Sequence, residues 1–340
     1  MRAAVTIRDV ARLAEVHPGT VSRALNVQTR ALVNPETAER VLRAAEELGY
    51  RPNPIARGLK TNRSYTVGVL IPDLTNPLFP PIMRGIEDRL EEAGYTSLIV
   101  NTDNDPDRER LQMETMRARQ VDGFIAATAR LDTELLSEAA AGGAPMVLVN
   151  RSLEDGSLPA VTVDDRQGIA LAVDHVVALG HEQIGHVAGP QNVSTGHRRH
   201  LGFRAAMARH DLDAPAAQIS FSAAFTETDG TRACVELLDR SPEVTAIVAA
   251  NDRVAIGCYD AFEARGLRCP EDISVTGFND MPFIERLRPP LTSVRVPQRE
   301  IGTVAAGLLL EQLSDQARAN EEILLEASLV IRGSTAPPRS

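Results

Sequence analysis

The sequence predicts a small all-α headpiece of the helix-turn-helix type, followed by an α/β core of two doubly wound parallel-sheet subdomains. In the first part, apolar residues recur with helical spacing in three short segments between Thr6 and Leu48. From Tyr65 onward, strand-like apolar runs alternate with amphipathic segments of helix length, which is typical of right-handed βαβ units. This second region of roughly 270 residues exceeds the usual size of one sheet, which favours two.

The three helical segments of the headpiece have recognisable ends. Thr6 can cap the first helix, and Pro18 suits the first turn of the second because that position needs no N–H donor. Asn34 followed by proline begins the third helix, and Gly49 ends it. The three apolar faces consist of Ile7, Val10, Ala11 and Ala14, of Val21, Ala24 and Leu25, and of Val41, Leu42, Ala45 and Leu48.

Residues 50–63 contain two prolines, a glycine and several cations, which indicates a linker. The core that follows has eight strand candidates, at 66–71, 96–101, 123–127, 146–150, 160–163, 184–188, 246–249 and 274–277. Its helix candidates are 82–93, 107–119, 167–179, 196–210, 228–240 and 254–265.

Charge is distributed unevenly along the chain. The net charge is −10, yet residues 1–63 carry +5 and the remainder −15. A basic head on an acidic body is typical of a protein that touches DNA at one end only. No apolar run reaches the roughly 18 residues of a membrane span, and the charged start argues against a signal peptide, so we expect a cytoplasmic protein without membrane partners. The three cysteines form no metal-type spacing and are expected to be small buried residues.

The second predicted helix carries the side chains that are suited to reading DNA. A pair of helices joined by a short turn can place its second helix in the major groove. Arg23 can donate two parallel hydrogen bonds to a guanine edge, whereas Thr20, Ser22 and Asn26 can bind bases or phosphates. A solvated polar face on a three-helix bundle is the alternative that these residues alone leave open.

Several separated strings resemble the lactose-repressor (LacI) family in order and spacing. They are Thr-Val-Ser-Arg-Ala-Leu-Asn at 20–26, Leu-Gly-Tyr-Arg-Pro-Asn at 48–53, Ala-Arg-Gly-Leu-Lys at 56–60, Asn-Pro at 76–77, Gly-Phe-Asn at 277–279 and Pro-Leu-Thr-Ser at 290–293. This likeness, which covers nearly the whole chain, implies a repressor that binds a pseudo-palindromic operator as a homodimer and responds to a small-molecule effector. The core would resemble type 1 periplasmic binding proteins.

The resemblance also implies domain limits: a headpiece at 1–49, a hinge at 50–63 with a helix at about 53–60, and a core at 64–335. Within the core, the N-subdomain would span about 64–163 plus 294–323, and the C-subdomain about 164–293 plus 324–335. The positions that match DNA contacts of the family are Thr6, Thr20, Ser22, Arg23, Asn26, Asn53, Ala56, Arg57, Leu59 and Lys60.

Leu59 matches the residue that wedges into the minor groove and kinks the operator, which implies that paired subunits share one bent site. Two departures from the family affect this half of the molecule. Gly58 lowers the helix propensity of the hinge by up to about 1 kcal/mol, so hinge folding would depend more strongly on DNA. His17-Pro18-Gly19 stands where polar residues often read bases, which leaves the operator sequence open.

Ligands of doubly wound proteins bind at the carboxyl ends of the parallel strands, here expected in the cleft between two sheets. By resemblance, the effector-binding positions are Asn76, Phe79, Arg151, His197, Arg199, Phe225, Asn251 and Asn279. Some have a plain structural alternative: Phe79 and Phe225 as core, Asn76 as a turn residue and Asn251 as a helix cap. Asn279 replaces an aspartate that is common in the family. Two arginines and the lack of tryptophan leave an acidic effector as open as a neutral sugar.

The enzyme alternative has no supporting motif. The sequence has no glycine-rich dinucleotide fingerprint, phosphate loop, nucleophile elbow or zinc-protease motif, and its single lysine is Lys60 in the linker. We therefore expect no catalytic activity, cofactor or bound metal. A periplasmic solute-binding protein would explain residues 64–330 equally well, but it would need an export signal and would have no use for residues 1–63.

Overall fold

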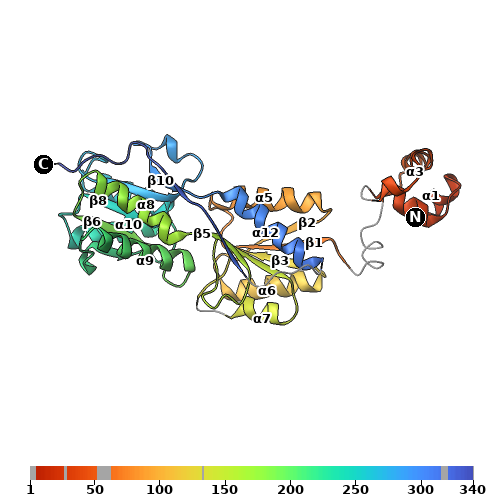
Figure 1. Cartoon of the computed structure of the whole chain (residues 1–340), viewed down its shortest axis with the longest axis horizontal. Coiled ribbons are helices and arrows are strands. Elements are labelled where there is room, and N and C mark those ends of the chain that lie inside the picture. Colours follow the sequence, from red (N-terminus) through yellow and green to blue (C-terminus); the bar gives the residue numbers. More distant parts are fainter. Residues whose placement is uncertain (1–4, 27–28, 52–62, 132–133, 315–320, 340) are drawn as a thin grey trace. The chain divides into compact units, whose positions relative to one another are not determined.

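The computed structural model describes residues 5–26, 29–51, 63–131, 134–314 and 321–339. By internal contacts the chain divides into two compact units, Met1–Ser64 and Tyr65–Ser340 (Figure 1). The predicted hinge residues Asn53, Ala56, Arg57, Leu59 and Lys60 lie outside the described residues.

The first unit is a small helical bundle whose helix starts are those that the sequence predicted. It contains α1 (Ile7–Leu13), α2 (Pro18–Leu25), a 3-10 turn (Arg30–Leu32) and α3 (Pro35–Glu47). Thr6 and Asp9 form a capping box at α1, and the Asn34 side chain accepts a hydrogen bond from the backbone N–H of Glu36 at α3. Val10, Val21 and Val41, one from each helix, are fully buried together. The bundle is therefore held by one apolar side chain per helix at its centre.

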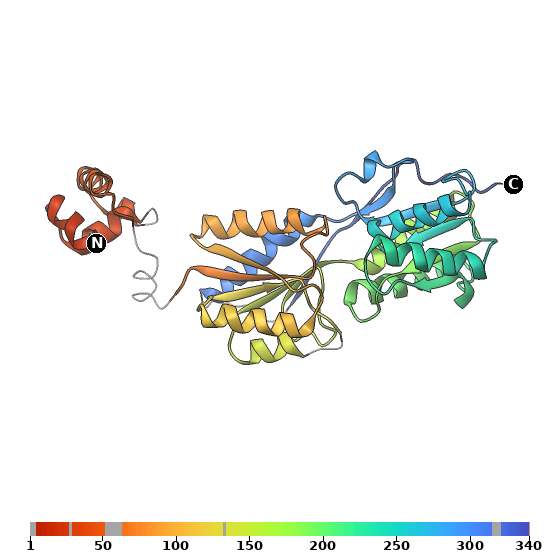
Figure 2. The same ribbon diagram turned by 180° about the vertical axis from the view of Figure 1, so that it is seen from behind.

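The second unit begins with a six-stranded parallel sheet in the order β11-β5-β4-β3-β1-β2. Its strands are β1 (Thr66–Ile71), β2 (Thr96–Asn101), β3 (Gly123–Ala126), β4 (Met146–Val149), β5 (Ala160–Val163) and β11 (Glu322–Leu325). Helices α5 (Phe79–Glu92) and α12 (Gln298–Leu313) cover one face, and α6 (Pro106–Ala118) and α7 (Leu135–Ala141) cover the other (Figures 1 and 2). Strand residues alternate between these two apolar layers, because successive side chains of a strand point to opposite faces.

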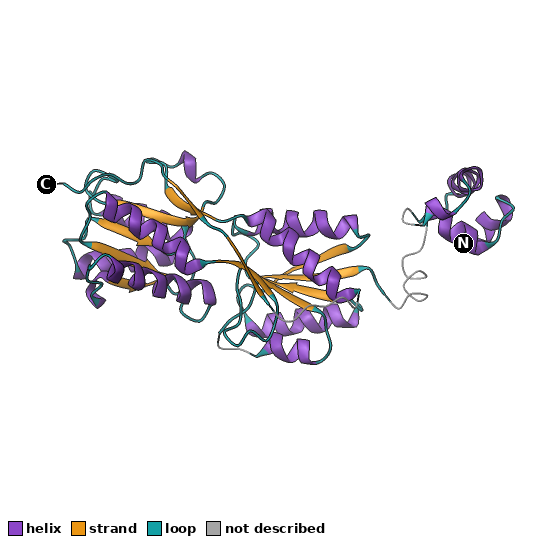
Figure 3. Ribbon diagram, in the orientation of Figure 1, coloured by secondary structure: helices purple, strands orange, loops and turns teal. Residues whose placement is uncertain are grey.

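A second six-stranded sheet has the order β12-β10-β9-β8-β6-β7 (Figure 3). Its strands are β6 (Ile184–Ala188), β7 (Ile219–Phe221), β8 (Ala246–Ala249), β9 (Ser274–Asn279), β10 (Thr292–Arg295) and β12 (Ser328–Val330). The helices of this subdomain are α8 (Asp165–Ala178), α9 (Ser194–Arg209), α10 (Glu227–Arg240) and α11 (Asp252–Ala264). The prediction of two parallel-sheet subdomains is confirmed, with one antiparallel edge strand, since β12 pairs antiparallel with β10.

The chain crosses between the two sheets three times: from β5 to α8, from β10 to α12 and from β11 to β12. Each sheet therefore combines a long early segment with a late one. The last crossing needs only two residues, Glu326 and Ala327, between β11 and β12. Strand β11 runs toward the junction and β12 continues away from it into the second sheet, so β12 runs opposite to β10, which also ends at the junction.

Candidate functional site

The second helix of the headpiece presents a polar face to its surroundings. Ser22 and Arg23 are exposed, Thr20 and Asn26 are half-buried, and Thr6 is exposed at the start of α1. The sequence analysis placed Asn26 on the second helix. In the structure, Asn26 is the capping residue that follows the last residue of α2. The side chains that were expected to read DNA are thus accessible within the headpiece.

Backbone carbonyls at the ends of the first two helices are held by side chains from elsewhere in the headpiece. Arg40 of α3 donates from Nε to the carbonyl of Ala14, at 3.2 Å, where α1 ends. Arg30 donates from Nε to the carbonyl of Ala24, at 2.9 Å, near the end of α2. His17 caps α2 by accepting at Nδ1 from the backbone N–H of Gly19. These bonds satisfy carbonyl and N–H groups that helix ends leave unpaired, and the Arg40 bond also ties α3 to the end of α1.

In the second unit, a pocket with about 280 Å³ of empty space, counting its space open to solvent, lies where the ends of strands from both sheets meet. Seven of the eight predicted effector residues line it, and the eighth, His197, does not. The lining residues are Asn76, Leu78, Phe79, Asn150, Arg151, Thr195, Arg199, Phe225, Asn251 and Asn279.

His197 lies instead beside Glu154, with 3.9 Å between Nε2 and the carboxylate, and its side chain is 37% exposed. Thr195, two residues earlier on α9, takes the place in the pocket that was expected for His197. Thr195, Asn150 and Leu78 were missed by the sequence analysis. Each lies close in sequence to a predicted residue. If every residue that follows a strand had been taken as a candidate, and not only those that match the family, Asn150 and Leu78 would have been found.

Arg199 is held rigidly at the floor of this pocket. Its Nε donates to Asp165 at 2.7 Å, and one terminal nitrogen donates to the carbonyl of Ala250 at 2.9 Å. Its guanidinium carbon lies 3.7 Å from the ring centre of Phe278, which is a cation–π contact. Both Arg199 and Asp165 are almost fully buried, so the orientation of the guanidinium is fixed before any ligand binds.

Arg151 follows β4 and enters the pocket from the other subdomain. It is buried, and its Nε has no hydrogen-bond partner among the described residues. Burial lowers the pKa of Arg151 to about 10, because the charged form loses solvation. Asn279, at the end of β9, has a positive φ of 113° and an amide oxygen without a partner. The pocket thus contains polar groups on both sides that are ready for a ligand.

Two asparagines of the pocket have a structural role, as a turn residue and as a helix cap, and also line the site. Asn76 accepts at Oδ1 from the backbone N–H of Leu78, at 3.0 Å, in the turn before α5. Asn251 accepts at Oδ1 from the backbone N–H of Val254, at 2.9 Å, as the cap of α11. Capping and ligand binding are therefore compatible, because each cap occupies the amide oxygen and leaves the NH₂ group.

The two aromatic residues, expected either in the core or in the effector site, both line the pocket. Phe79 is 2% exposed and belongs to the apolar core, while its ring edge lines the pocket. Phe225 is half-buried. A Cβ on Gly189 would lie 2.4 Å from the ring of Phe225, so only glycine at that position leaves the ring room to reach the pocket.

Polar contacts join the two subdomains around the pocket. Arg253 of α11 reaches Asp73, which follows β1, at 3.0 Å, and also Glu227 at 2.8 Å. On another side, the backbone N–H of Ser152 donates to the Ser194 hydroxyl at 3.0 Å. The bonds Arg253–Asp73 and Ser152–Ser194 link the two subdomains, so any change in the angle between the subdomains must break or rearrange them.

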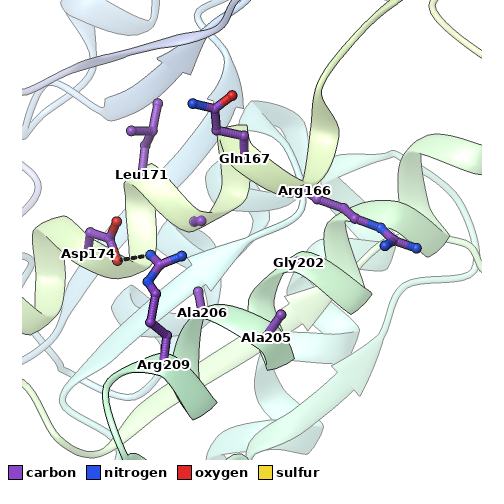
Figure 4. A pocket seen from close by; sticks show the side chains of 9 residues that line it. Arg166, Gln167, Leu171, Asp174, Gly202, Ala205, Ala206 and Arg209 are labelled. Carbon is purple, nitrogen blue, oxygen red and sulfur yellow. Dashed lines mark hydrogen bonds and ion pairs between the residues drawn. The ribbon is translucent and has the colours of Figure 1, made fainter. Parts of the chain in front are cut away.

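A larger hollow of about 810 Å³, counting its space open to solvent, lies between α8 and α9 (Figure 4). Arg209 and Asp174 form an ion pair across it, and Gln167, Leu171 and Arg166 complete its walls. None of the predicted site residues lines it. Both helices belong to one subdomain, so this groove is separate from the junction at which a ligand could change the angle between subdomains.

Neither a metal centre nor a membrane-spanning helix was found in the described part of the chain. No group of three or more His, Cys, Asp or Glu side chains there could hold a metal ion. No described helix is both long and apolar enough to cross a lipid bilayer. Cys234 and Cys258 are buried free thiols, and Cys269 is a half-buried one.

Comparison with known proteins identifies the architecture. The model of the family "Bacterial regulatory proteins, lacI family" matches residues 6–53, and that of the "Periplasmic binding protein-like domain" matches residues 173–335. The ribose operon repressor of Halalkalibacterium halodurans is 33% identical over 330 residues, covering 97% of both chains.

Two solved structures resemble the chain closely. One is the lac repressor dimer bound to operator and the anti-inducer ONPF, with a TM-score of 0.85 and 29% identity over 98% of this chain and 100% of that one. The other is a LacI family transcriptional regulator from Enterococcus faecium with bound ribose, with a TM-score of 0.70 and 34% identity over 81% of this chain and 100% of that one.

A helix-turn-helix headpiece and a two-sheet core with a polar pocket between its subdomains define a ligand-responsive regulatory protein. The chain belongs to the lacI family of bacterial regulatory proteins. The resemblance that the sequence strings indicated is confirmed.

Proposed function

We propose that this protein is a transcriptional repressor that binds operator DNA as a homodimer and changes its DNA affinity when a small polar metabolite binds in the core. One observation carries the proposal: a single chain combines an accessible polar face on α2 with a buried polar pocket at the junction of two subdomains. The polar face of α2 is suited to a DNA groove, and the pocket is suited to a metabolite. A ligand-controlled regulator needs both sites.

The headpiece would bind DNA through α2 in the major groove. Arg23 would contact a guanine edge, while Thr6, Thr20, Ser22 and Asn26 would bind phosphates or bases. The exposure of Arg23 and Ser22 supports this assignment. We retain the hinge at 50–63, with Asn53, Ala56, Arg57, Leu59 and Lys60 as further contacts, as a prediction from the resemblance.

A homodimer would present two headpieces to the two halves of a pseudo-palindromic operator. The similarity to a lac repressor dimer on its operator supports this assembly. We place the subunit contact on the core and include α5, because this helix lies at the outer face of the first sheet, in the subdomain that the linker enters.

The effector would be a sugar, a sugar acid or a similar polar metabolite. The pocket offers guanidinium and amide groups for hydroxyls and two aromatic side chains for the apolar face of a ring. Bound ribose in the Enterococcus faecium regulator supports a ligand of this size. Because the pocket spans both subdomains, ligand binding would alter their relative angle and shift DNA affinity, typically by a factor of about 5 to 150.

We further propose that the protein acts in the cytoplasm, where its DNA target lies, and has neither catalytic activity nor a cofactor. The alternative, a periplasmic solute-binding protein, would share the core but leave the headpiece without a task. The match of residues 6–53 to the lacI family favours the regulator.

The test compares the binding of labelled genomic fragments by the full chain and by its second unit, Tyr65–Ser340, which is a compact unit by contacts. The full chain should retain a specific subset of fragments and the second unit none. Arg23→Ala should lose that subset, whereas Arg43→Ala, an exposed arginine of α3 as control, should keep it. Equal retention by both proteins would contradict a role for the headpiece.

A further inference from the structure

The polar groups that line the effector pocket are predominantly hydrogen-bond donors. Two guanidinium groups, four amides and one hydroxyl face it, together with Leu78, Phe79 and Phe225. None of the described lining residues carries a carboxyl group. A neutral sugar donates through every hydroxyl and needs acceptors, whereas an anion needs donors, so the balance of donors and acceptors discriminates between the two.

The amide groups strengthen this imbalance. The side-chain oxygens of Asn76 and Asn251 already accept backbone N–H groups, as the turn and the helix cap require. One lone pair of each oxygen is therefore already used, whereas the NH₂ group of each residue can donate to a ligand. The oxygen of Asn279 has no partner and remains as an amide acceptor in the lining.

The charge of Arg199 is already compensated within the protein. Asp165 accepts from its Nε, the carbonyl of Ala250 accepts from a terminal nitrogen, and Phe278 lies under its guanidinium plane. In the ion pair between Arg199 and Asp165 the two charges compensate each other. Arg199 can still position a ligand, but it does not by itself call for an anion.

Arg151 differs, because its charge is buried without an ion pair among the described residues. Its Nε has no hydrogen-bond partner among the described residues, and the residue as a whole is only 6% exposed. Glu109 is an acid with an electrostatic effect on Arg151, but it accepts a hydrogen bond from Thr128 and does not line the pocket. A buried guanidinium in this state is costly and should be paired with a negative partner when the pocket is filled.

We propose that the effector is a sugar acid of single-sugar size whose carboxylate binds Arg151. Its hydroxyl oxygens accept from the amides of Asn76 and Asn251, one hydroxyl donates to Asn279, and Phe79 and Phe225 cover its apolar face. This proposal rests on the proposed function, since it names the chemical class of the metabolite that the regulator detects. The ribose bound in the Enterococcus faecium regulator supports a ligand of one sugar unit.

The test is a thermal-shift titration of the full chain with matched pairs at equal ionic strength. The pairs are gluconate and glucose, galacturonate and galactose, and ribonate and ribose, with ribose 5-phosphate as a phosphate probe. At least one acid should raise the melting temperature in proportion to the logarithm of its concentration, well above its neutral partner. Equal or larger shifts with neutral sugars, no shift with any acid, or a shift with the phosphate alone would overturn the proposal.

Charge variants test the same point without knowledge of the natural effector. Arg151→Gln should weaken acid binding roughly tenfold to hundredfold, as the loss of a charged hydrogen bond does. Asn279→Asp, which changes charge at constant shape, should also weaken it, while Glu109→Gln should strengthen it. Arg166→Gln, an exposed arginine of the outer groove, serves as control and should leave it unchanged. Circular dichroism verifies the fold of each variant.

Failure of this inference can be told apart from failure of the proposed function. A neutral sugar that stabilises the chain and alters retention of genomic DNA would keep the regulator and overturn the acidic effector. An acid that binds through Arg151 and leaves DNA retention unchanged would keep the site and overturn its regulatory role. If the unsubstituted chain and the Arg151→Gln variant bound the acid with equal affinity, Arg151 would not be part of the binding site.

Discussion

The buried ion pair between Asp165 and Arg199 allows a quantitative test of how the pocket floor is built. The two side chains are 1% and 3% exposed, and Nε and Oδ1 are 2.7 Å apart. Asp165→Asn keeps the shape and removes the charge, which leaves the buried guanidinium of Arg199 without its ion-pair partner. Breaking one side of a buried pair costs about 3–5 kcal/mol, a large part of the roughly 5–15 kcal/mol that stabilise a typical domain.

Burial raises the pKa of Asp165 even though Arg199 acts to lower it, so desolvation exceeds the attraction between the two charges. The pair therefore positions Arg199 more than it stabilises the fold. It follows that removing both charges should cost less than removing one. We expect the double variant Asp165→Asn/Arg199→Met to be more stable than Asp165→Asn alone.

Urea unfolding of the full chain, followed by circular dichroism, measures these free energies. The control is Glu236→Gln, which breaks a pair with Arg232 at the same distance of 2.7 Å, but with both side chains 49% exposed. Exposed helix pairs of this spacing contribute only about 0.3–0.5 kcal/mol. A loss below about 1 kcal/mol for Asp165→Asn, or additive losses in the double variant, would refute the reasoning.

Three further predictions concern other parts of the chain. Burial raises the pKa of Asp252 to about 7, so between about pH 4 and pH 7 the folded state keeps a proton that the unfolded state loses. The free energy of unfolding should fall by about 1.4 kcal/mol per pH unit across that window relative to Asp252→Asn, and parallel urea profiles would contradict this. Arg253→Met removes an ion pair between the subdomains and should enlarge the ligand-free chain in X-ray scattering, whereas Arg268→Met, whose pair lies within one subdomain, should not. Leu59→Ala should weaken specific DNA binding far more than non-specific binding in gel-shift titrations, and equal losses would count against the wedge.

Local signals in the sequence were sufficient for the headpiece and for most of the core. The starts of α1, α2 and α3 follow from Thr6, Pro18 and Asn34, because capping depends on a few adjacent residues. The first two strands of the core agree with the predicted ranges residue for residue. The first strand is a near-continuous apolar run, as a strand buried on two faces must be, whereas the second is an edge strand with a shorter apolar centre at Leu98–Val100.

The elements that the sequence analysis missed depend on distant partners. Strand β7 has three residues, and β12 enters its sheet by pairing with β10, more than thirty positions earlier. Helix α12 packs beside α5, although the two are separated by more than 200 residues. Such segments carry little periodic signal of their own, because their partners supply the contacts that define them.

The sequence by itself determined the family and the two-part organisation and, through the resemblance to that family, seven of the residues that line the pocket. Only the tertiary structure decided which side chains face the pocket and which charged groups are paired. It turned His197 toward Glu154, brought in Thr195, paired Arg199 with Asp165 and left Arg151 without an ion pair among the described residues. These outcomes depend on distances between segments far apart in the chain, and pairing and burial, rather than residue type, set the charge that a ligand meets.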